Sequence, residues 1–194
     1  MLEKPSIHIY FLNPHVRSDN DCGAVNQQER SRLKMDNHYI AGFVDGEGSF
    51  HVAFQKNLSV RLGWQAVPEF QISQNWHAER VLQLIQEMLD CGYIKQNHIK
   101  NERDRTLVFV VRNRNDLLQK IIPFFDKYPL YTEKKNDFIR FKQIVKMMDR
   151  GDHLSIDGFS EIVELAYSMN ANGSYRKVKK EKILTTLKSS EAIR

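Results

Sequence analysis

Two periods of apolar and polar positions follow each other along the chain from residue 36 onward. Between residues 37 and 45 apolar side chains recur at helical spacing, which predicts a helix, and Asp36 or Asn37 can cap its first turn. The next segment, "SFHVAFQ" at 49–55, alternates between apolar and polar residues and predicts a strand with one buried face.

The same two periods then repeat. "WQAVPEFQIS" at 64–73 predicts a second strand, in which Pro68 marks an edge or a bulge. A helix follows, with Asn75 as its cap and Gly92 as its stop signal. The strands expected next are "YIKQNHI" and "RTLVFVV".

Helical patterns fill the C-terminal half. A helix from about Asn115 tolerates Pro123 only with a kink or a break. Thr132 can cap a long helix that follows, and "DGFSEIVELAYSMN" and the basic end of the chain predict two more.

This order of elements predicts an α+β fold: a four-stranded antiparallel sheet with helices on one face and additional C-terminal helices. With 194 residues, 41% of them hydrophobic, the chain can bury one substantial core. We expect that core at 36–170. Residues 1–35 are polar and aperiodic and form an arm or a leader, and 171–194 form a basic helix or tail.

The second face of the predicted sheet is polar and no predicted helix covers it. Such a face suits DNA or RNA, and it is equally what a solvated sheet looks like. The residues expected on it are His51, Gln55, Arg61, Gln65, Glu69, Gln71, Ser73, Lys95 and Asn97.

Charge and cysteine content narrow the classes of protein to which the chain can belong. Residues 174–194 carry seven basic and two acidic side chains, which accounts for the whole net charge of +5 and suits a polyanion, although a solvated helix would look the same. The two cysteines form no metal-binding pair. No apolar run approaches the roughly 20 residues of a membrane span.

The first predicted helix has an unusual composition. Gly42 and Gly46 lie four residues apart with Ala41 beside them, although an interior glycine costs a helix about 0.5–1 kcal/mol relative to alanine. Small residues at this spacing let a second helix approach closely. We therefore expect a second helix to pack against these three residues.

Two carboxylates stand at the end of the same helix. Asp45 and Glu47 lie at the negative end of the helix dipole, where acidic groups are disfavoured unless a cation meets them. Mg²⁺ takes carboxylate and carbonyl oxygens of this kind. An EF-hand is excluded, because its sixth and twelfth loop positions would be Phe50 and Lys56. A metal site and a tight helix-to-strand turn with incidental acids both remain open.

A longer pattern favours the metal site. "IAGFVDGEG" at 40–48 resembles the nine-residue signature of the LAGLIDADG homing endonucleases. The resemblance extends from residue 36 to about 170 through "GEGSF", "PEFQISQ", "CGYI", "NDLLQKIIPFFDKYPLYTEKKNDFIRFKQIV", "HLSIDG" and "MN" in this order. "LAYSMNANGSY" echoes the signature only loosely, since Asn170 and Asn172 stand where the acids would be.

The resemblance implies an αββαββα core and a DNA endonuclease encoded within an intron. With one signature, the chain should form a homodimer through Ala41, Gly42 and Gly46 and cut both strands of a long pseudo-palindromic double-stranded DNA site. It implies Mg²⁺ or Mn²⁺ as cofactor and an intracellular location in a mitochondrion, a chloroplast or an archaeal cytoplasm, with no membrane partner.

The family pattern also implies residue roles. Glu47 and the Gly48 carbonyl would bind metal, while Asp45 would brace the turn or the interface. Gln74 matches a residue that orients solvent, and Lys134 matches a lysine near the scissile phosphate, although the adjacent Lys135 leaves the register open by one. The alternatives are an RNA maturase that binds its own intron RNA and a catalytically decayed DNA-binding protein.

Overall fold

The computed structural model describes residues 35–98, 103–173 and 176–191. The chain divides into two units, 1–34 and 35–194, and every described residue belongs to the second. The predicted arm or leader at 1–35 therefore lies outside the described residues, except for Met35, which packs against the core.

The elements follow the predicted order. The strands are β1 (Gly48–Lys56), β2 (Trp64–Asn75), β3 (Tyr93–Gln96) and β4 (Thr106–Val111). The α-helices are α2 (Asn37–Glu47), α3 (Glu79–Leu89), α4 (Arg114–Asp116), α5 (Ile122–Lys127), α6 (Lys134–Arg150), α7 (Ile156–Tyr167) and α8 (Lys180–Glu191). Short helical turns are η1 (Trp76–Ala78), η2 (Leu117–Ile121), η3 (Asp152–Leu154) and η4 (Ala171–Gly173).

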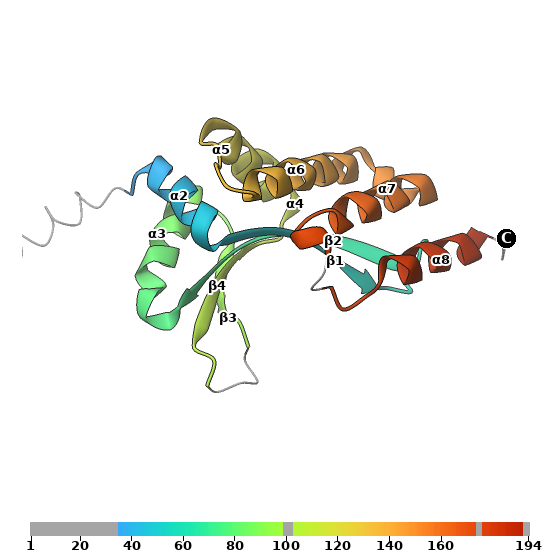
Figure 1. Ribbon diagram of the computed structural model, residues 1–194, viewed down its shortest axis with the longest axis horizontal. Helices are drawn as coiled ribbons and strands as arrows, with labels where there is room; N and C mark the ends of the chain where they lie inside the picture. Colours follow the sequence, from blue (N-terminus) through green and yellow to red (C-terminus); the bar gives the residue numbers. More distant parts are fainter. Residues whose placement is uncertain (1–34, 99–102, 174–175, 192–194) are drawn as a thin grey trace, which may run out of the picture. The chain divides into compact units, whose positions relative to one another are not determined.

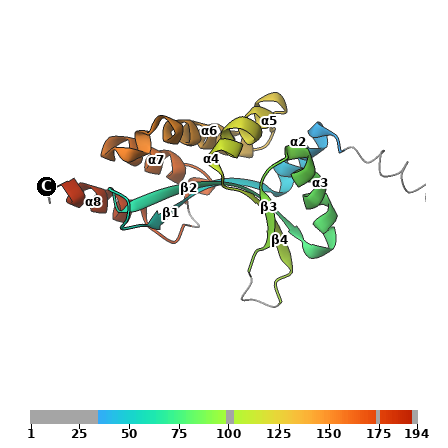
Figure 2. The same ribbon diagram turned by 180° about the vertical axis from the view of Figure 1, so that it is seen from behind.

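The four strands form one antiparallel sheet in the order β1-β2-β4-β3, which confirms the predicted α+β fold. Helices α5, α6 and α7 lie on one side of this sheet, and the β3–β4 hairpin extends to the other side (Figure 1). The reverse view in Figure 2 shows the same separation. One face of the sheet therefore carries the core, and the second is left for other contacts.

Pro68 and Pro123 are accommodated as their chemistry requires. Pro68 pairs with Val52 of β1 but lies beyond the stretch of β2 that pairs with β4, so its missing N–H breaks no ladder on that side. Pro123 lies within helical residues 114–127, which run without interruption, and the π-helical turn η2 directly before it accommodates the missing N–H. Pro68 thus lacks a strand partner on one side only, and the helix is locally irregular before Pro123 without being broken.

Aromatic side chains join the sheet to the helices. The ring of Phe50 on β1 lies 5.1 Å from Phe70 on β2, 5.4 Å from Phe125 on α5 and 5.4 Å from Phe141 on α6, measured between centroids. All four side chains are buried. This cluster holds β1, and with it the end of α2, against the helical layer.

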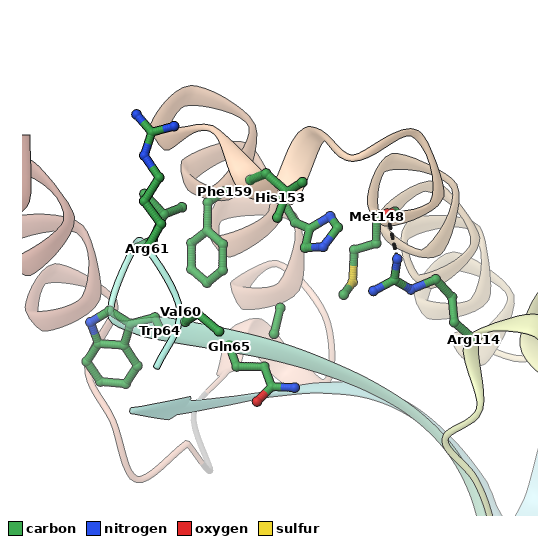
Figure 3. Close-up of a pocket in the computed structure, with 11 residues that line it drawn as sticks. Val60, Arg61, Trp64, Gln65, Arg114, Met148, His153 and Phe159 are labelled. Carbon is green, nitrogen blue, oxygen red and sulfur yellow. Dashed lines mark hydrogen bonds between the residues drawn. The ribbon is translucent and has the colours of Figure 1, made fainter. Parts of the chain in front are cut away.

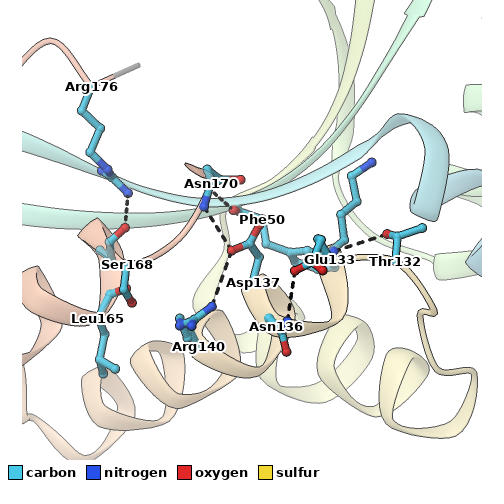
Figure 4. Close-up of polar contacts among 12 residues, drawn as sticks. Phe50, Thr132, Glu133, Asn136, Asp137, Arg140, Leu165, Ser168, Asn170 and Arg176 are labelled. Carbon is cyan, nitrogen blue, oxygen red and sulfur yellow. Dashed lines mark hydrogen bonds and ion pairs between the residues drawn. The ribbon is translucent and has the colours of Figure 1, made fainter. Parts of the chain in front are cut away.

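The free edge of β1 is covered by the segment that follows α7. Asn170 donates its side-chain amide to the Phe50 carbonyl at 2.9 Å (Figure 4). Arg176 donates to the Val52 carbonyl at 2.6 Å. The backbone N–H of Asn170 donates in turn to Asp137 of α6. Edge carbonyls that would otherwise invite another strand are thus satisfied within the chain.

The C-terminal helix belongs to the same core. Ile183 and Leu187 of α8 are buried, and α8 packs against α7. Arg176, expected in a basic tail, instead donates to backbone carbonyls and lies over the Tyr167 ring at 4.7 Å. Exposed cations on this segment include Lys177 and Lys179, which keeps part of the predicted basic surface.

Arg176→Met is expected to lower the free energy of unfolding by about 2–4 kcal/mol, because the Val52 and Ala166 carbonyl oxygens would each lose a charged donor. Urea unfolding measures this. The exposed Lys177→Met is the control and should change stability by less than about 0.5 kcal/mol. Equal stabilities for the two variants would contradict the edge-covering role.

Candidate active site

The two sides of α2 are chemically different. Ile40 and Val44 are fully buried, whereas Gly42 and Gly46 are exposed, and a Cβ added at either glycine would meet nothing within 4 Å. The fold of the single chain therefore does not require glycine at these positions. Tyr39, 52% exposed, lies at helical spacing from both glycines and extends this open stripe.

Ala41 departs from its predicted place. It is only 5% exposed, so it packs within its own chain rather than in the open stripe. The reason is the helical turn of about 100° per residue, which rotates Ala41 away from its neighbour Gly42 toward the core. Residues 39, 42 and 46 define the open stripe of α2.

Asp45 holds a distant loop against the end of α2. Its carboxylate accepts hydrogen bonds from the backbone N–H groups of Tyr131, at 2.8 Å, and Thr132, at 3.2 Å, and from the Thr132 hydroxyl. These contacts place the start of α6 beside the helix end. Both carboxylate oxygens of Asp45 are engaged in this way.

Lys134 is the lysine that reaches this end of the helix. Its Nζ donates to the carbonyl oxygens of Asp45 at 2.8 Å and Gly46 at 2.7 Å, while Lys135 points to solvent as an exposed side chain. A cation at the last carbonyls of a helix is favoured by the helix dipole. Of the two adjacent lysines, Lys134 is therefore the one in contact with the α2 end.

Glu47 is exposed, and within the described part of the chain no hydrogen bond or ion pair engages its carboxylate. The next residue must be small. A Cβ on Gly48 would lie 2.5 Å from Val44 Cγ1, and the Gly48 N–H donates to the Val44 carbonyl. This close approach lets the chain pass directly from helix to strand, with Glu47 at the corner.

Gln74 lies near the far end of β2, two residues from Ile72, the register partner of Gly48. It is half-buried, and its side-chain oxygen accepts from the backbone N–H of Asn75 at 3.3 Å. Strand alternation puts it on the helix-covered side with Ile72, in the direction of the α2 end.

One chain alone offers few metal ligands. Among the described residues no three His, Cys, Asp or Glu side chains gather in one place. The free Glu47 carboxylate and the neighbouring backbone carbonyls are hard oxygen donors of the type that Mg²⁺ and Mn²⁺ prefer. They fit such an ion, but they fill only part of its coordination shell.

The uncovered sheet face carries most of the predicted polar residues. Strand register pairs His51 with Glu69, Ser49 with Gln71 and Gln55 with Gln65 on this face. Ser73 and Lys95 face the same way on β2 and β3, where both flank Val108 of β4. Asn97 follows β3, and its backbone N–H donates to Thr106.

Two of the predicted contacts need correction. Arg61 lies in the loop between β1 and β2 and lines a hollow on the helix side, because loop residues do not follow strand alternation (Figure 3). Glu69 lies on the predicted face but is only 3% exposed, because its carboxylate is enclosed by its neighbours. It is therefore not a freely accessible contact.

The hollow in Figure 3 has a volume of about 370 Å³ and is lined by loop 57–63, β2, α6, η3 and α7. Its wall includes Trp64 and His153, whose Nε1 and Nδ1 atoms have no hydrogen-bond partner within the described chain. Burial and the nearby Arg114 lower the pKa of His153. Neither Glu47 nor Lys134 lines this hollow.

Sequence reasoning missed Arg112, which continues the alternation of Val108 and Val110 onto the uncovered face. Its Nε lies 2.5 Å from Glu69 Oε1. The sequence "VFVVRN" contains the signal for this, because the alternation of the strand continues one residue beyond the apolar run, to Arg112. Sequence reasoning also missed Trp76, 41% exposed, with the Arg105 guanidinium 5.3 Å from its ring.

The contacts of Glu69 predict a dependence of stability on pH. Burial alone would raise the pKa of this carboxyl, but hydrogen bonds and charges from His51 and Arg112 outweigh burial and lower the pKa from 4.5 to about 2. Because the folded pKa is the lower one, the stabilisation is complete above pH 4.5 and is lost as the pH falls toward 2.

Between pH 6 and pH 2 the unfolding free energy of wild-type protein should therefore fall by about 3 kcal/mol more than that of Glu69→Gln. Urea unfolding across this pH range measures the difference. The variant Glu161→Gln, at an exposed position of α7, should follow the wild-type curve. A Glu69→Gln curve parallel to wild type would contradict this role of the carboxylate.

The α2 end lies within a segment that matches a known protein family. Residues 40–145, which begin with the α2 signature and end within α6, match the family model described as LAGLIDADG endonuclease. The chain belongs to the LAGLIDADG endonuclease family. The LAGLIDADG core seen here, α2 to α6 around one sheet, is the unit that the match covers.

Individual relatives agree with this family. "Probable intron-encoded endonuclease 2" of Neurospora crassa is 41% identical over 178 residues, covering 86% of this chain and 38% of that protein. The crystal structure of the homing endonuclease I-TnaI is 35% identical, with a TM-score of 0.68, over 80% of this chain and 98% of that one. The archaeal intron-encoded homing endonuclease I-Vdi141I, solved with DNA, is 33% identical with a TM-score of 0.71, over 80% of this chain and 96% of that one.

The chain spans only part of some relatives. It matches 26% of the length of "Probable intron-encoded endonuclease 3" and 38% of the length of "Probable intron-encoded endonuclease 2", both of Neurospora crassa. Within the described residues, no helix combines the length and the apolar character needed to cross a membrane.

Proposed function

We propose that this LAGLIDADG protein is a site-specific homing endonuclease that hydrolyses both strands of a long pseudo-palindromic DNA site as a metal-dependent homodimer. The observation that carries the proposal is the α2 end, where an exposed and unpaired Glu47 carboxylate stands at the negative pole of a helix. The Lys134 ammonium already contacts the last carbonyls of this helix, but the Glu47 carboxylate itself has no partner in the described chain. A divalent cation would pair with that carboxylate and a DNA phosphate at the same place.

The open stripe of α2 supports pairing of two copies. Gly42 and Gly46 leave space that no part of their own chain fills, and a two-fold axis along this stripe would bring a second Glu47 close to the first. Each copy would then present its sheet to one DNA half-site. A two-fold protein predicts a pseudo-palindromic target.

The residues at the corner fit Mg²⁺ or Mn²⁺. The Glu47 carboxylate and the Gly48 carbonyl would hold the ion, and the second copy would supply further oxygen ligands. When bound, the ion provides Lewis-acid chemistry for phosphodiester hydrolysis. Support for a divalent cation comes from the relative I-SmaMI, which has been solved with its uncleaved DNA target in the presence of calcium ions.

The neighbouring side chains have separate tasks. An ammonium group has three N–H donors, and Lys134 uses two of them on the Asp45 and Gly46 carbonyls, so the third can donate to a phosphate oxygen and offset its negative charge. Gln74 orients the attacking water. Asp45 keeps Lys134 in place by holding the loop before α6.

The uncovered sheet face is the proposed DNA surface. Its side chains can contact base edges in the major groove, and the exposed cations at the C-terminal segment add salt-sensitive contacts to the phosphate backbone. The DNA complexes of I-SmaMI and I-Vdi141I support DNA as the partner. The compartment would be that of the intron-bearing gene: mitochondrion, chloroplast or archaeal cytoplasm.

Lys134→Met is expected to lower the DNA cleavage rate about 100-fold, because the charge that faces the phosphate is removed. Lys135→Met, one residue along the same helix and exposed, should stay within about threefold of wild type. Single-turnover cleavage with Mg²⁺ measures both. Equal losses for the two lysines would contradict the assignment.

The function is tested by incubating the purified protein and Mg²⁺ with DNA that spans the uninterrupted insertion site, and with the same DNA interrupted by the intron. Cleavage of only the uninterrupted DNA is the expected result. In parallel, splicing of the intron RNA is followed with and without protein. Stimulated splicing without DNA cleavage would establish the RNA maturase instead, and binding without either activity would establish a decayed DNA-binding protein.

A further inference from the structure

A buried carboxylate lies in the middle of the proposed DNA surface. Glu69 of β2 is 3% exposed, and register places it directly between His51 of β1 and the residue after Val111 at the end of β4, which is Arg112. Its position on a polyanion-binding face is unfavourable unless its charge is neutralised. Its neighbours do neutralise it.

Each oxygen of Glu69 has a defined partner set. Oε1 forms an ion pair with Arg112, whose Nε lies 2.5 Å away. Oε2 accepts from Gln71 Nε2 at 2.5 Å and lies 3.3 Å from His51 Nε2. Three DNA-facing side chains from three adjacent strands are thus fixed by one buried group.

The contact to Arg112 leaves its terminal nitrogens available. Glu69 engages Nε, and in the described part of the chain no partner is found for Nη1 and Nη2. The Arg112 side chain is 43% exposed on the uncovered face. A guanidinium held through Nε presents its two terminal N–H groups as a planar fork, the geometry that matches O6 and N7 of guanine.

We propose that Arg112 reads one guanine in each DNA half-site and that Glu69 is the positioning residue that holds its guanidinium in the reading orientation. This rests on the proposed function, because it presumes that the sheet face binds DNA. Gln71, which donates one amide N–H to the same carboxylate, is held beside Arg112 and contacts a neighbouring base pair.

The packing of the sheet does not require the ionic cluster around Glu69. The adjacent rows of the same face hold apolar pairs such as Ala53 with Val67, and Val110 on β4 is fully buried, so the sheet accepts apolar side chains here. A buried ion pair usually stabilises a fold no more than well-packed apolar residues do. The ionic cluster adds a fixed orientation of the Arg112 guanidinium.

The test measures base preference at every position of a half-site, by selecting bound sequences from a randomised DNA library. Arg112→Ala is expected to reduce the guanine preference at one position about 10- to 100-fold and to leave the other positions unchanged. Arg112→Lys keeps the charge but not the fork, so it should lose the same preference while the salt dependence of binding is retained. Glu69→Gln keeps Arg112 and should weaken the guanine preference at that same position.

Lys95→Ala, on the same face but outside the cluster, is the control and should leave the Arg112 position unchanged. Urea unfolding confirms that each variant is folded. Sequence-specific binding by wild type, with all base preferences unchanged in Arg112→Ala, would overturn the inference and leave the proposed function standing. A general loss of affinity in Glu69→Gln without a change at one position would overturn the positioning role. Absence of sequence-specific DNA binding by wild type would overturn both.

Discussion

Replacing Glu47 by glutamine is expected to abolish DNA cleavage and to leave DNA binding intact. The carboxylate is exposed and unpaired in the described chain, so an amide at this position would disturb no contact of the fold but would remove the anionic metal ligand. We expect the single-turnover cleavage rate with Mg²⁺ to fall by at least about 10³-fold. Binding is measured separately with Ca²⁺ by gel shift and should change by less than about threefold.

The matched control for this experiment is Glu161→Gln, an acid-to-amide change at an exposed position of α7 far along the chain. It should cleave at the wild-type rate. If Glu47→Gln also cleaved at that rate, the metal site would have to be sought elsewhere. If Glu47→Gln lost DNA binding as strongly as cleavage, the residue would be a DNA contact rather than a catalytic ligand.

Gly42→Ala should stabilise the single chain and weaken its pairing. A methyl group at this position meets nothing within 4 Å in the chain, and replacing an interior helical glycine by alanine gains about 0.5–1 kcal/mol of helix stability. Between two closely packed helices the same methyl groups are overpacked, at a cost of about 1–3 kcal/mol. We therefore expect a higher unfolding temperature at low concentration and a dimer dissociation constant at least about tenfold larger.

Sedimentation at several protein concentrations measures the pairing, and thermal unfolding measures stability. Gln143→Ala, at an exposed position of α6, serves as the control and should change neither assembly nor cleavage. A Gly42→Ala variant that pairs and cleaves like wild type would show that α2 does not form a close helix contact. Loss of stability in the variant would show that the chain itself needs the glycine.

The helices and strands can be predicted from the sequence because each of them buries one face. The alternation of 49–55 and 64–73 and the helical spacing around Ile85 leave few arrangements other than helices on one face of an antiparallel sheet. Helix ends were placed less well. α3 ends at Leu89 rather than at Gly92, and Asp90 adopts the left-handed backbone conformation at φ 50°. Aspartate can adopt this conformation because its short polar side chain forms local hydrogen bonds.

Only those parts of the candidate site whose residues are close together in the sequence can be predicted from it. The signature at 40–48 lies within one helix and its turn, so Glu47 and Gly48 could be named from it. Asp45 contacts Tyr131, 86 positions further along the chain, and no period in the sequence reports such a contact. The choice of Lys134 over Lys135 likewise depends on how α6 is rotated against α2.

The predicted role of a residue is wrong where its contacts in the fold, and not its residue type, determine what it does. Glu69 has the chemistry of a base contact, but three neighbours enclose it and make it a support for Arg112 instead. Arg176 was part of a basic segment suited to DNA, but its guanidinium is used on the edge carbonyls of β1. Charge could be counted from the sequence, whereas the direction in which each charge points required the fold.

The most direct measurement is to map the cut ends on both strands of DNA that carries the uninterrupted insertion site, after incubation with the protein and Mg²⁺. Paired α2 helices predict one cut on each strand, placed symmetrically about the centre of the site, and both cuts absent with Glu47→Gln. No cleavage, cuts on one strand only, or cuts that persist in the Glu47→Gln variant would contradict cleavage by a two-fold pair of α2 corners.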